Sequence, residues 1–259
     1  MVTRADSLPP PWSDRIGRHT VLQAEFMMQH SQAMQSYTPV SALDTESRST
    51  FIWRTYGHVA GAILGFGAIE TYLFENGLAE PLAQSMLGFN WLLILGAFMI
   101  VGWLASHVAH RVESKPLQYL ALVGFVVAEA IIFIPLLYMA MVMQPAIIES
   151  AVGVTLMGTA GLTAVAFITR KDFSFLRGML VWGGILAMVA IAGSVLFGFH
   201  MGTWFSVAMI GFAGAAVLYD TSNILHHYPE DRYVAAALGL FASIALMFWY
   251  VLRLFMSRN

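Results

Sequence analysis

Three of the carboxylates in the apolar segments of this chain of 259 residues are the groups whose chemistry stands out. They are Glu70, Glu129 and Asp220. A charge near the centre of a bilayer is costly, so such a residue is protonated, paired with a partner or turned towards a polar cavity. Each of the three is therefore a candidate for the path of a proton or a cation.

Each carboxylate also has a purely structural explanation. Glu129, in "GFVVAEAIIFIPLL", lies about 18 Å from the start of its segment at Leu117, where a protonated side chain can donate to a neighbouring carbonyl. Asp220 can hold its helix to a backbone donor or an arginine, and Asn223 follows it on the same helix face. Glu70 is close to the outer end of its segment, so we interpret it as an interface residue that reaches the headgroups.

The segments that position these groups are long enough to cross a membrane. Hydrophobic residues make up 58% of the chain, charged residues 11%, and the mean hydropathy is +0.70. Apolar stretches lie at 56–74, 88–106, 117–141, 146–169, 176–198, 203–226 and 234–255. Each has about the 20 residues that a spanning helix needs, and none alternates like a strand of a membrane barrel. We predict an all-α membrane protein, a bundle of seven transmembrane helices.

The distribution of Lys and Arg predicts an N-terminus in the cytoplasm. The N-terminal region and the second, fourth and sixth connections carry these residues, whereas the first, third and fifth carry none. With seven spans, Arg253 and Arg258 would lie on the side of the membrane opposite the cytoplasm, which is an exception to the charge rule. A last helix that enters the membrane and returns to the same side would remove this exception. The absence of cysteine fits a multi-pass protein of the cell inner membrane.

The chain divides into a polar N-terminal tail, residues 1–49, and a transmembrane domain, residues 50–259. The tail has no apolar core followed by a cleavage site, so we do not interpret it as a signal peptide. Its composition predicts a largely disordered segment. The stretch "VLQAEFMMQHSQAMQSY" has loosely helical spacing of apolar residues, which also allows a helix on the membrane surface or one that binds a membrane-protein partner.

Composition and motifs exclude several classes of function. The net charge of −2 gives no basic field for nucleic acid. The motifs HExxH, GxSxG and GxGxxG and the P-loop are absent, so we expect no enzyme and no resident cofactor. His226 and His227 are adjacent and cannot share a helix face as a metal-binding pair. An ion path or an interaction surface remains.

Two stretches resemble the Bax inhibitor-1 family, also known by its transmembrane Bax-inhibitor motif. They are "TRKDFSFLRG" (169–178) and "VLYDTSNIL" (217–225) followed by "YPEDRYVAAALGLF" (228–241), and the resemblance covers about residues 50–256. It implies six helices around a central seventh. For bacterial members it implies a pH-sensitive calcium leak in which an aspartate of helix six and one of helix seven share a proton. Asp220 matches the first aspartate.

The second aspartate of the family pattern is replaced here. The segment "AALGLFASI" (236–244) places Ser243 where that aspartate is expected. Two carboxylates a few ångströms apart cannot both ionise, and an aspartate that faces a serine loses this coupling. Ser243 lies about 15 Å from the start of its helix, a depth similar to that of Glu129. We therefore hypothesise a cluster of Glu129, Asp220 and Ser243 in which Glu129 supplies the missing carboxylate.

Two functions follow from the sequence. The first is a pH-modulated leak channel for calcium or another cation, with protons, calcium and lipid as its partners. Calcium needs six to eight oxygen ligands, so any binding at Asp220 and Glu129 would be weak and transient. The alternative is a non-channel interaction protein that regulates membrane proteostasis by binding a membrane protease or stress-response partner. The buried acids would then only hold the bundle together.

Overall fold

Helices dominate the part of the chain that the computed structural model describes, residues 38–199 and 201–258. The α-helices there are α2 (Thr45–Glu75), α3 (Ala79–Leu87), α4 (Trp91–Arg111), α5 (Lys115–Met143), α6 (Ala146–Thr169), α7 (Leu176–Phe197), α8 (Gly202–His226) and α9 (Tyr233–Met256). Short 3-10 helices are η1 (Val40–Ala42) and η2 (Glu230–Arg232). The predicted all-α class is confirmed. The predictions for the tail up to residue 37 lie outside the described residues, and the helical structure begins before residue 50.

Six of the described helices, α4 to α9, have the length and apolar composition of membrane spans. They coincide with six of the predicted segments. The first predicted segment, 56–74, falls within α2, which is 31 residues long but includes Arg48, Arg54 and Glu70 and is not among the six. The structure therefore confirms a polytopic membrane protein but not the count of seven spans.

Helix α3 is not among the predicted segments. Its nine residues rise about 14 Å, too little to cross a membrane. Ala79 and Ala83 are buried in a small cluster with Ile134 of α5, so α3 closes one end of the bundle. A search for segments of spanning length passes over such a helix.

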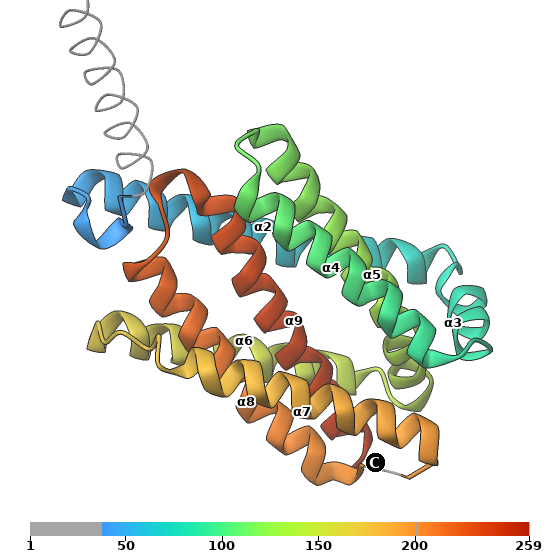
Figure 1. The fold of residues 1–259 in the computed structure, drawn as a ribbon. Helices are drawn as coiled ribbons and strands as arrows, with labels where there is room; N and C mark the ends of the chain where they lie inside the picture. The colour runs from blue at the N-terminus through green and yellow to red at the C-terminus, as the bar shows by residue number, and fades with distance from the viewer. Residues whose placement is uncertain (1–37, 200, 259) are drawn as a thin grey trace, which may run out of the picture. The chain divides into compact units, whose positions relative to one another are not determined.

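The last helix, α9, occupies the centre of the bundle. Fifteen of its 24 residues are buried, against one of 22 in α7. It packs on α2, α4, α5, α6 and α8, while α7 packs mainly on α8. Figure 1 shows α9, in dark red, crossing between α4 and α5 on one side and α6 to α8 on the other. The last helix thus has the central position that the resemblance implies.

An aromatic cluster joins α5 to α9. Phe133, which is 1% exposed, lies parallel to the ring of Phe248 at 5.4 Å between centroids and edge-on to Trp249 at 5.0 Å. Phe66 of α2 meets Phe133 edge-on at 5.1 Å. Aromatic pairs with these offsets add about 0.5–1.5 kcal/mol beyond area burial. This cluster holds the C-terminal half of α9 against α2 and α5.

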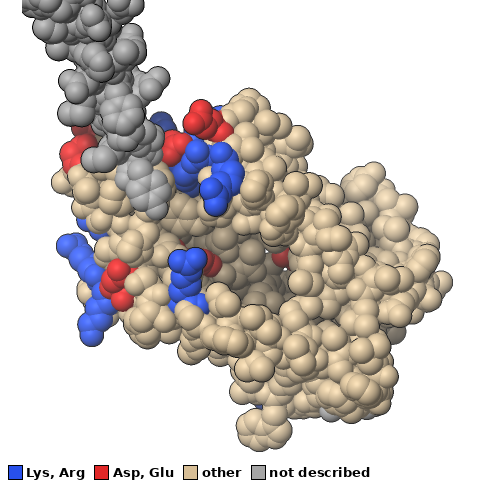
Figure 2. All heavy atoms as spheres, viewed as in Figure 1, with Lys and Arg blue, Asp and Glu red and all other residues tan. Residues whose placement is uncertain are grey.

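Hydrogen bonds tie several chain connections together at one end of the bundle, which we call the polar end (links 112–114, 170–175 and 227–232). Arg232 donates to the carbonyl of Val112 at 2.7 Å, and Lys115 donates to the carbonyl of Asp231. The N–H of Val40 donates to the carbonyl of Tyr228 at 2.9 Å, beside an antiparallel bridge between Pro39 and Pro229. Figure 2 shows charged side chains gathered on this side of the molecule.

Candidate functional site

The structure brings together two of the predicted site residues, Asp220 of α8 and Ser243 of α9. The Ser243 hydroxyl donates to Oδ2 of Asp220 at 2.5 Å, a distance typical of a hydroxyl bound to an ionised carboxylate. Ser243 is buried and Asp220 is half-buried. Because α9 is central, this pair links a carboxylate to the axis of the bundle.

A small gap at Gly239 brings a third group to the pair. A methyl group at Gly239 would lie 3.9 Å from Oδ1 of Asp220 and 3.7 Å from the hydroxyl of Tyr228. Gly239 and Ser243 are four residues apart, so they share one face of α9. The tyrosine comes from the link after α8, and sequence reasoning did not single it out. In the sequence, Tyr228 was marked only by its position eight residues after Asp220, at the start of the stretch "YPEDRYVAAALGLF".

Tyr228 connects the site to α4. Nδ1 of His110 lies 2.8 Å from the carbonyl of Ser106, which can only accept, so Nδ1 carries the proton. In the neutral ring Nε2 then accepts from the Tyr228 hydroxyl at 3.3 Å. Burial first, and then the nearby charge of Asp220, raises the pKa of Tyr228, so the hydroxyl keeps its proton. The neutral hydroxyl and the carboxylate border the same gap at Gly239.

Buried hydroxyls without a hydrogen-bond partner are also found on the helices around α9. Among the described residues they include Tyr56 of α2, Thr159 of α6 and Thr221, which follows Asp220 directly. Buried polar groups are normally paired, and water or an ion commonly serves those that the protein leaves unpaired. Such hydroxyls therefore lie on α2, α6 and α8, three of the helices that pack on α9.

Glu129 faces the interior but is not joined to the pair. Its side chain is 6% exposed, so it does not point at lipid. Within the described residues it has no hydrogen bond to Asp220 or Ser243. One turn away on either side, Phe125 and Phe133 pack on aromatic rings of α9, which gives α5 an apolar contact there. Membership of Glu129 in the cluster stays a prediction.

Glu70 is not the interface residue that its position suggested. Its side chain is 7% exposed, and neither carboxylate oxygen has a hydrogen-bond partner. The prediction was wrong because α2 presents this residue to α6 and α9 rather than to the outside of the bundle. Depth in a segment does not reveal which side of the helix faces the core.

Asn223 contributes through its backbone. Its carbonyl accepts from the N–H groups of His227 at 2.8 Å and Tyr228 at 3.2 Å, which ends α8 and turns the chain. In the described part of the chain its side chain has no hydrogen bond to Asp220. Asn223 thus positions Tyr228, and its predicted part in the ion path stays a prediction.

The surface of the bundle is hollowed in front of α9. Figure 2 shows the hollow between the two groups of helices, with acidic atoms visible inside it. Residues 38–199 and 201–258 contain no group of three or more His, Cys, Asp or Glu placed to hold a metal ion. Asp220 and Ser243 offer only part of the six to eight oxygens that calcium takes, so calcium at this point would stay largely hydrated.

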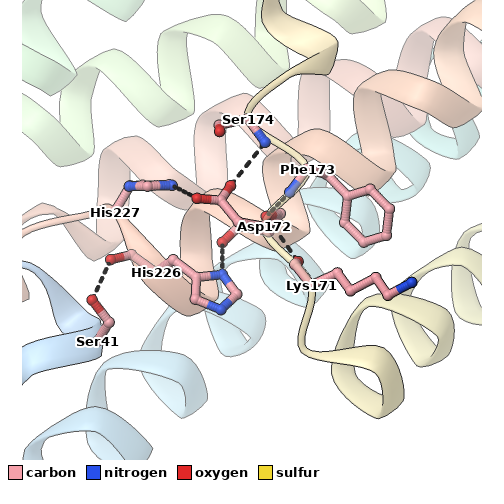
Figure 3. A network of polar contacts seen from close by, with 8 residues as sticks. Ser41, Lys171, Asp172, Phe173, Ser174, His226 and His227 are labelled. Carbon is pink, nitrogen blue, oxygen red and sulfur yellow. Dashed lines mark hydrogen bonds and ion pairs between the residues drawn. The ribbon is translucent and has the colours of Figure 1, made fainter.

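A polar network fixes the end of α8 close to the site (Figure 3). The buried hydroxyl of Ser222 accepts from the N–H of Phe173 at 2.9 Å, and Nδ1 of His226 lies 2.9 Å from the Ser222 carbonyl. Nε2 of His227 lies 2.9 Å from Oδ2 of Asp172, within the 170–175 link. Since Ser222 is two residues from Asp220, this network fixes the position of Asp220 relative to the polar end.

We expect replacement of Asp172 by Asn to loosen the 170–175 link only slightly. The N–H of Ser174, followed by the side chain of His227, lowers the pKa of Asp172 below 3.8. A lowered pKa means that the stabilisation is complete above about pH 4 and is lost as the pH falls through the folded value. Both side chains are about half exposed, so the effect should stay below about 1 kcal/mol. Hydrogen exchange of the link at pH 7 measures it, and Asp172→Ala, which also removes the acceptor for Ser174, should exchange faster than Asp172→Asn.

Substitutions at Gly239 should separate small from large side chains. Alanine fits the gap at ordinary contact distance, and it favours the helix by up to about 1 kcal/mol, so Gly239→Ala should unfold at or slightly above the wild-type temperature. Leucine would press against Asp220 and Tyr228 and should cost about 1–3 kcal/mol. Thermal unfolding in detergent tests this. Gly124→Leu on α5, where nothing lies within 4 Å, is the control and should be tolerated.

The chain is similar in sequence to a family model and to several known proteins. The family model described as "Inhibitor of apoptosis-promoting Bax1" matches residues 48–259. The chain is 31% identical to Bax inhibitor 1 of Schizosaccharomyces pombe over 233 residues, 84% of this chain and 80% of that protein. It is 34% identical over 112 residues to an uncharacterized protein of Pseudomonas aeruginosa, with 42% of this chain and 49% of that protein covered.

A third relative carries a functional name. The chain is 30% identical over 118 residues to the Modulator of FtsH protease YccA of Escherichia coli, with 44% of this chain and 52% of that protein covered. The chain thus spans about half the length of its P. aeruginosa and E. coli relatives, and most of its S. pombe relative.

Proposed function

The chain belongs to the Bax inhibitor family, and from this premise we propose that it is a cation leak channel, calcium foremost, controlled by protonation at Asp220. The observation that carries the proposal is the short hydrogen bond from Ser243 to Asp220 on the central helix. A carboxylate on an ion path attracts cations, and its charge disappears when it takes up a proton. The role is not enzymatic.

The proposal includes a topology. We propose that α2 is a seventh span, because it is 31 residues long and packs on α5 and α9 in the same bundle as the six apolar helices. Lys and Arg gather at the polar end, which supports a cytoplasmic location for that end and for the N-terminus in the inner membrane. Asp220, about six residues inside that end, then lies within reach of cytoplasmic protons.

The missing second aspartate changes the expected titration. Serine does not ionise in the biological pH range, so the pair of Asp220 and Ser243 has a single titratable group. Two coupled carboxylates would titrate in two macroscopic steps. This protein should instead show one step in the pH dependence of its leak. That difference separates it from family members with both acids.

Calcium entry into liposomes containing the purified protein tests the channel proposal. The flux of the wild type is recorded from about pH 5 to pH 8 against empty liposomes. We expect a protein-dependent flux with one titration step. Glu129→Gln is compared in the same assay. A change in the pH at which the flux titrates would show that Glu129 belongs to the site, and an unchanged titration would exclude Glu129 from it. Liposomes that stay tight to calcium at every pH would refute the channel.

A second candidate function is regulation of a membrane protease, favoured by the name of the E. coli relative. The tail would then recognise the partner. The best deletion removes residues 1–37, because Val40 is fully buried and bonded to Tyr228 and should remain. Under the channel proposal this deletion leaves flux intact. Under the second, co-purification with a membrane protease is lost while the bundle stays folded.

A further inference from the structure

A cavity lies between α2, α5, α6 and α9, and Asp220 is not among its lining residues. Its volume is about 310 Å³, at the lower end of the range of small-molecule sites, about 300–1,000 Å³. Its walls are mainly apolar and include Ile63, Phe66, Ile148, Phe241 and Phe248. The cavity could accept an organic molecule.

Two residues that line the cavity, Glu70 and Thr155, have polar atoms that nothing in the protein satisfies. Both carboxylate oxygens of Glu70 and the hydroxyl of Thr155 are buried and have no hydrogen-bond partner. Glu70 is 7% exposed and Thr155 is 2% exposed. Leaving a buried acid or hydroxyl unpaired destabilises the folded state, because the group loses its hydrogen bonds to water and gains none. A partner from outside the chain would remove this cost.

The hydroxyl of Thr155, like those of Thr159 and Thr221, lacks a bond to the preceding helical turn. Thr55 and Thr169 donate to the carbonyl four residues earlier, at 2.9 Å and 2.7 Å, as threonines in apolar helices commonly do. Thr155 lies in the middle of α6 and makes no such bond. The hydroxyl of Thr155 on α6 and the carboxyl of Glu70 on α2 are therefore both available to bind one molecule in the cavity.

The chemistry of the walls selects the occupant. A calcium ion needs six to eight oxygens, and the cavity offers three unpartnered side-chain oxygens among hydrocarbon walls. A plain acyl chain would fill the space but leave the acid and the hydroxyl unsatisfied. A protonated amine donates to both, and the phenyl rings in the walls attract a cation. Only the amine satisfies every part of the lining.

We propose that this cavity binds a lipophilic amine, whose ammonium group pairs with Glu70 and Thr155 and whose apolar body lies against Phe66, Phe241 and Phe248. The cavity uses the face of α9 formed by residues 241, 244, 245 and 248, and Ser243 is not among its lining residues. The proposal therefore stands independently of the cation leak.

Calorimetric titration of the full chain in lipid nanodiscs tests the proposal, with empty nanodiscs subtracted. The probe is 1-adamantylamine, a compact cage amine, and 1-adamantanol is its uncharged counterpart. We expect saturable binding of the amine to the wild type. Glu70→Gln should weaken it at least about tenfold, because a charged hydrogen bond is lost, while binding of the alcohol stays unchanged. Thr155→Val should weaken amine binding several-fold.

Matched variants keep the result interpretable. Glu129→Gln replaces the other buried glutamate, which does not line the cavity, and should bind the amine like the wild type. Ala245→Leu fills part of the cavity and should weaken both compounds, which covers the case in which Glu70→Gln fails to fold. Equal amine affinity in wild type and Glu70→Gln, or no saturable binding beyond that of empty nanodiscs, would overturn the proposal.

Discussion

Replacing Asp220 by Asn is expected to reduce the calcium flux by about tenfold or more and to abolish its dependence on pH. Asparagine keeps the size of the side chain and can still accept from Ser243, but it cannot ionise. A unit charge 4 Å from another contributes about 4 kcal/mol near a protein surface, and a tenfold change in rate needs only about 1.4 kcal/mol. Flux into liposomes over the pH range measures both effects.

Variants at Ser243 control for simple disruption of the site. Ser243→Ala removes the hydrogen bond but leaves the charge, so its flux should still respond to pH in one step. Ser243→Asp rebuilds an acid pair across α8 and α9, and the response should then extend over two steps. Flux of Asp220→Asn equal to that of the wild type at every pH would exclude Asp220 from the path.

Replacing Phe133 by Ala should have the largest effect on stability, about 3–5 kcal/mol. This ring is 1% exposed and touches α2 through Phe66 and α9 through Phe248 and Trp249. Its removal leaves a void where three helices meet, and neighbouring rings can fill only part of it. The free energy of unfolding in mixed detergent micelles measures the loss.

A lipid-facing residue of the same helix provides the comparison for Phe133. Ile131 is 50% exposed, so Ile131→Ala should change the free energy of unfolding by less than about 1 kcal/mol. If Phe133→Ala and Ile131→Ala cost the same, the aromatic cluster would not be the centre of stability that its burial indicates.

The sequence predicted the helical class and the ends of six apolar helices well, because length and hydropathy are local properties. Asp220 and Ser243 were found from a motif and from the alignment it implies. Tyr228 and His110 were not, because their meeting depends on how α4 lies against the link after α8. Rotation about the helix axis was equally invisible, and this is why Glu70 was misplaced and why the position of Glu129 stays a prediction.

The contact of Val40 with Tyr228 gives the start of the chain a mechanical connection to the centre of the bundle. The backbone of residues 39 and 40 pairs with that of residues 228 and 229, and the hydroxyl of Tyr228 borders the same gap at Gly239 as the carboxylate of Asp220. A protein that pulled on the preceding residues would transmit its force to the tyrosine directly. Recruitment of a partner and control of an ion leak would then be one event, felt through a single short stretch of backbone.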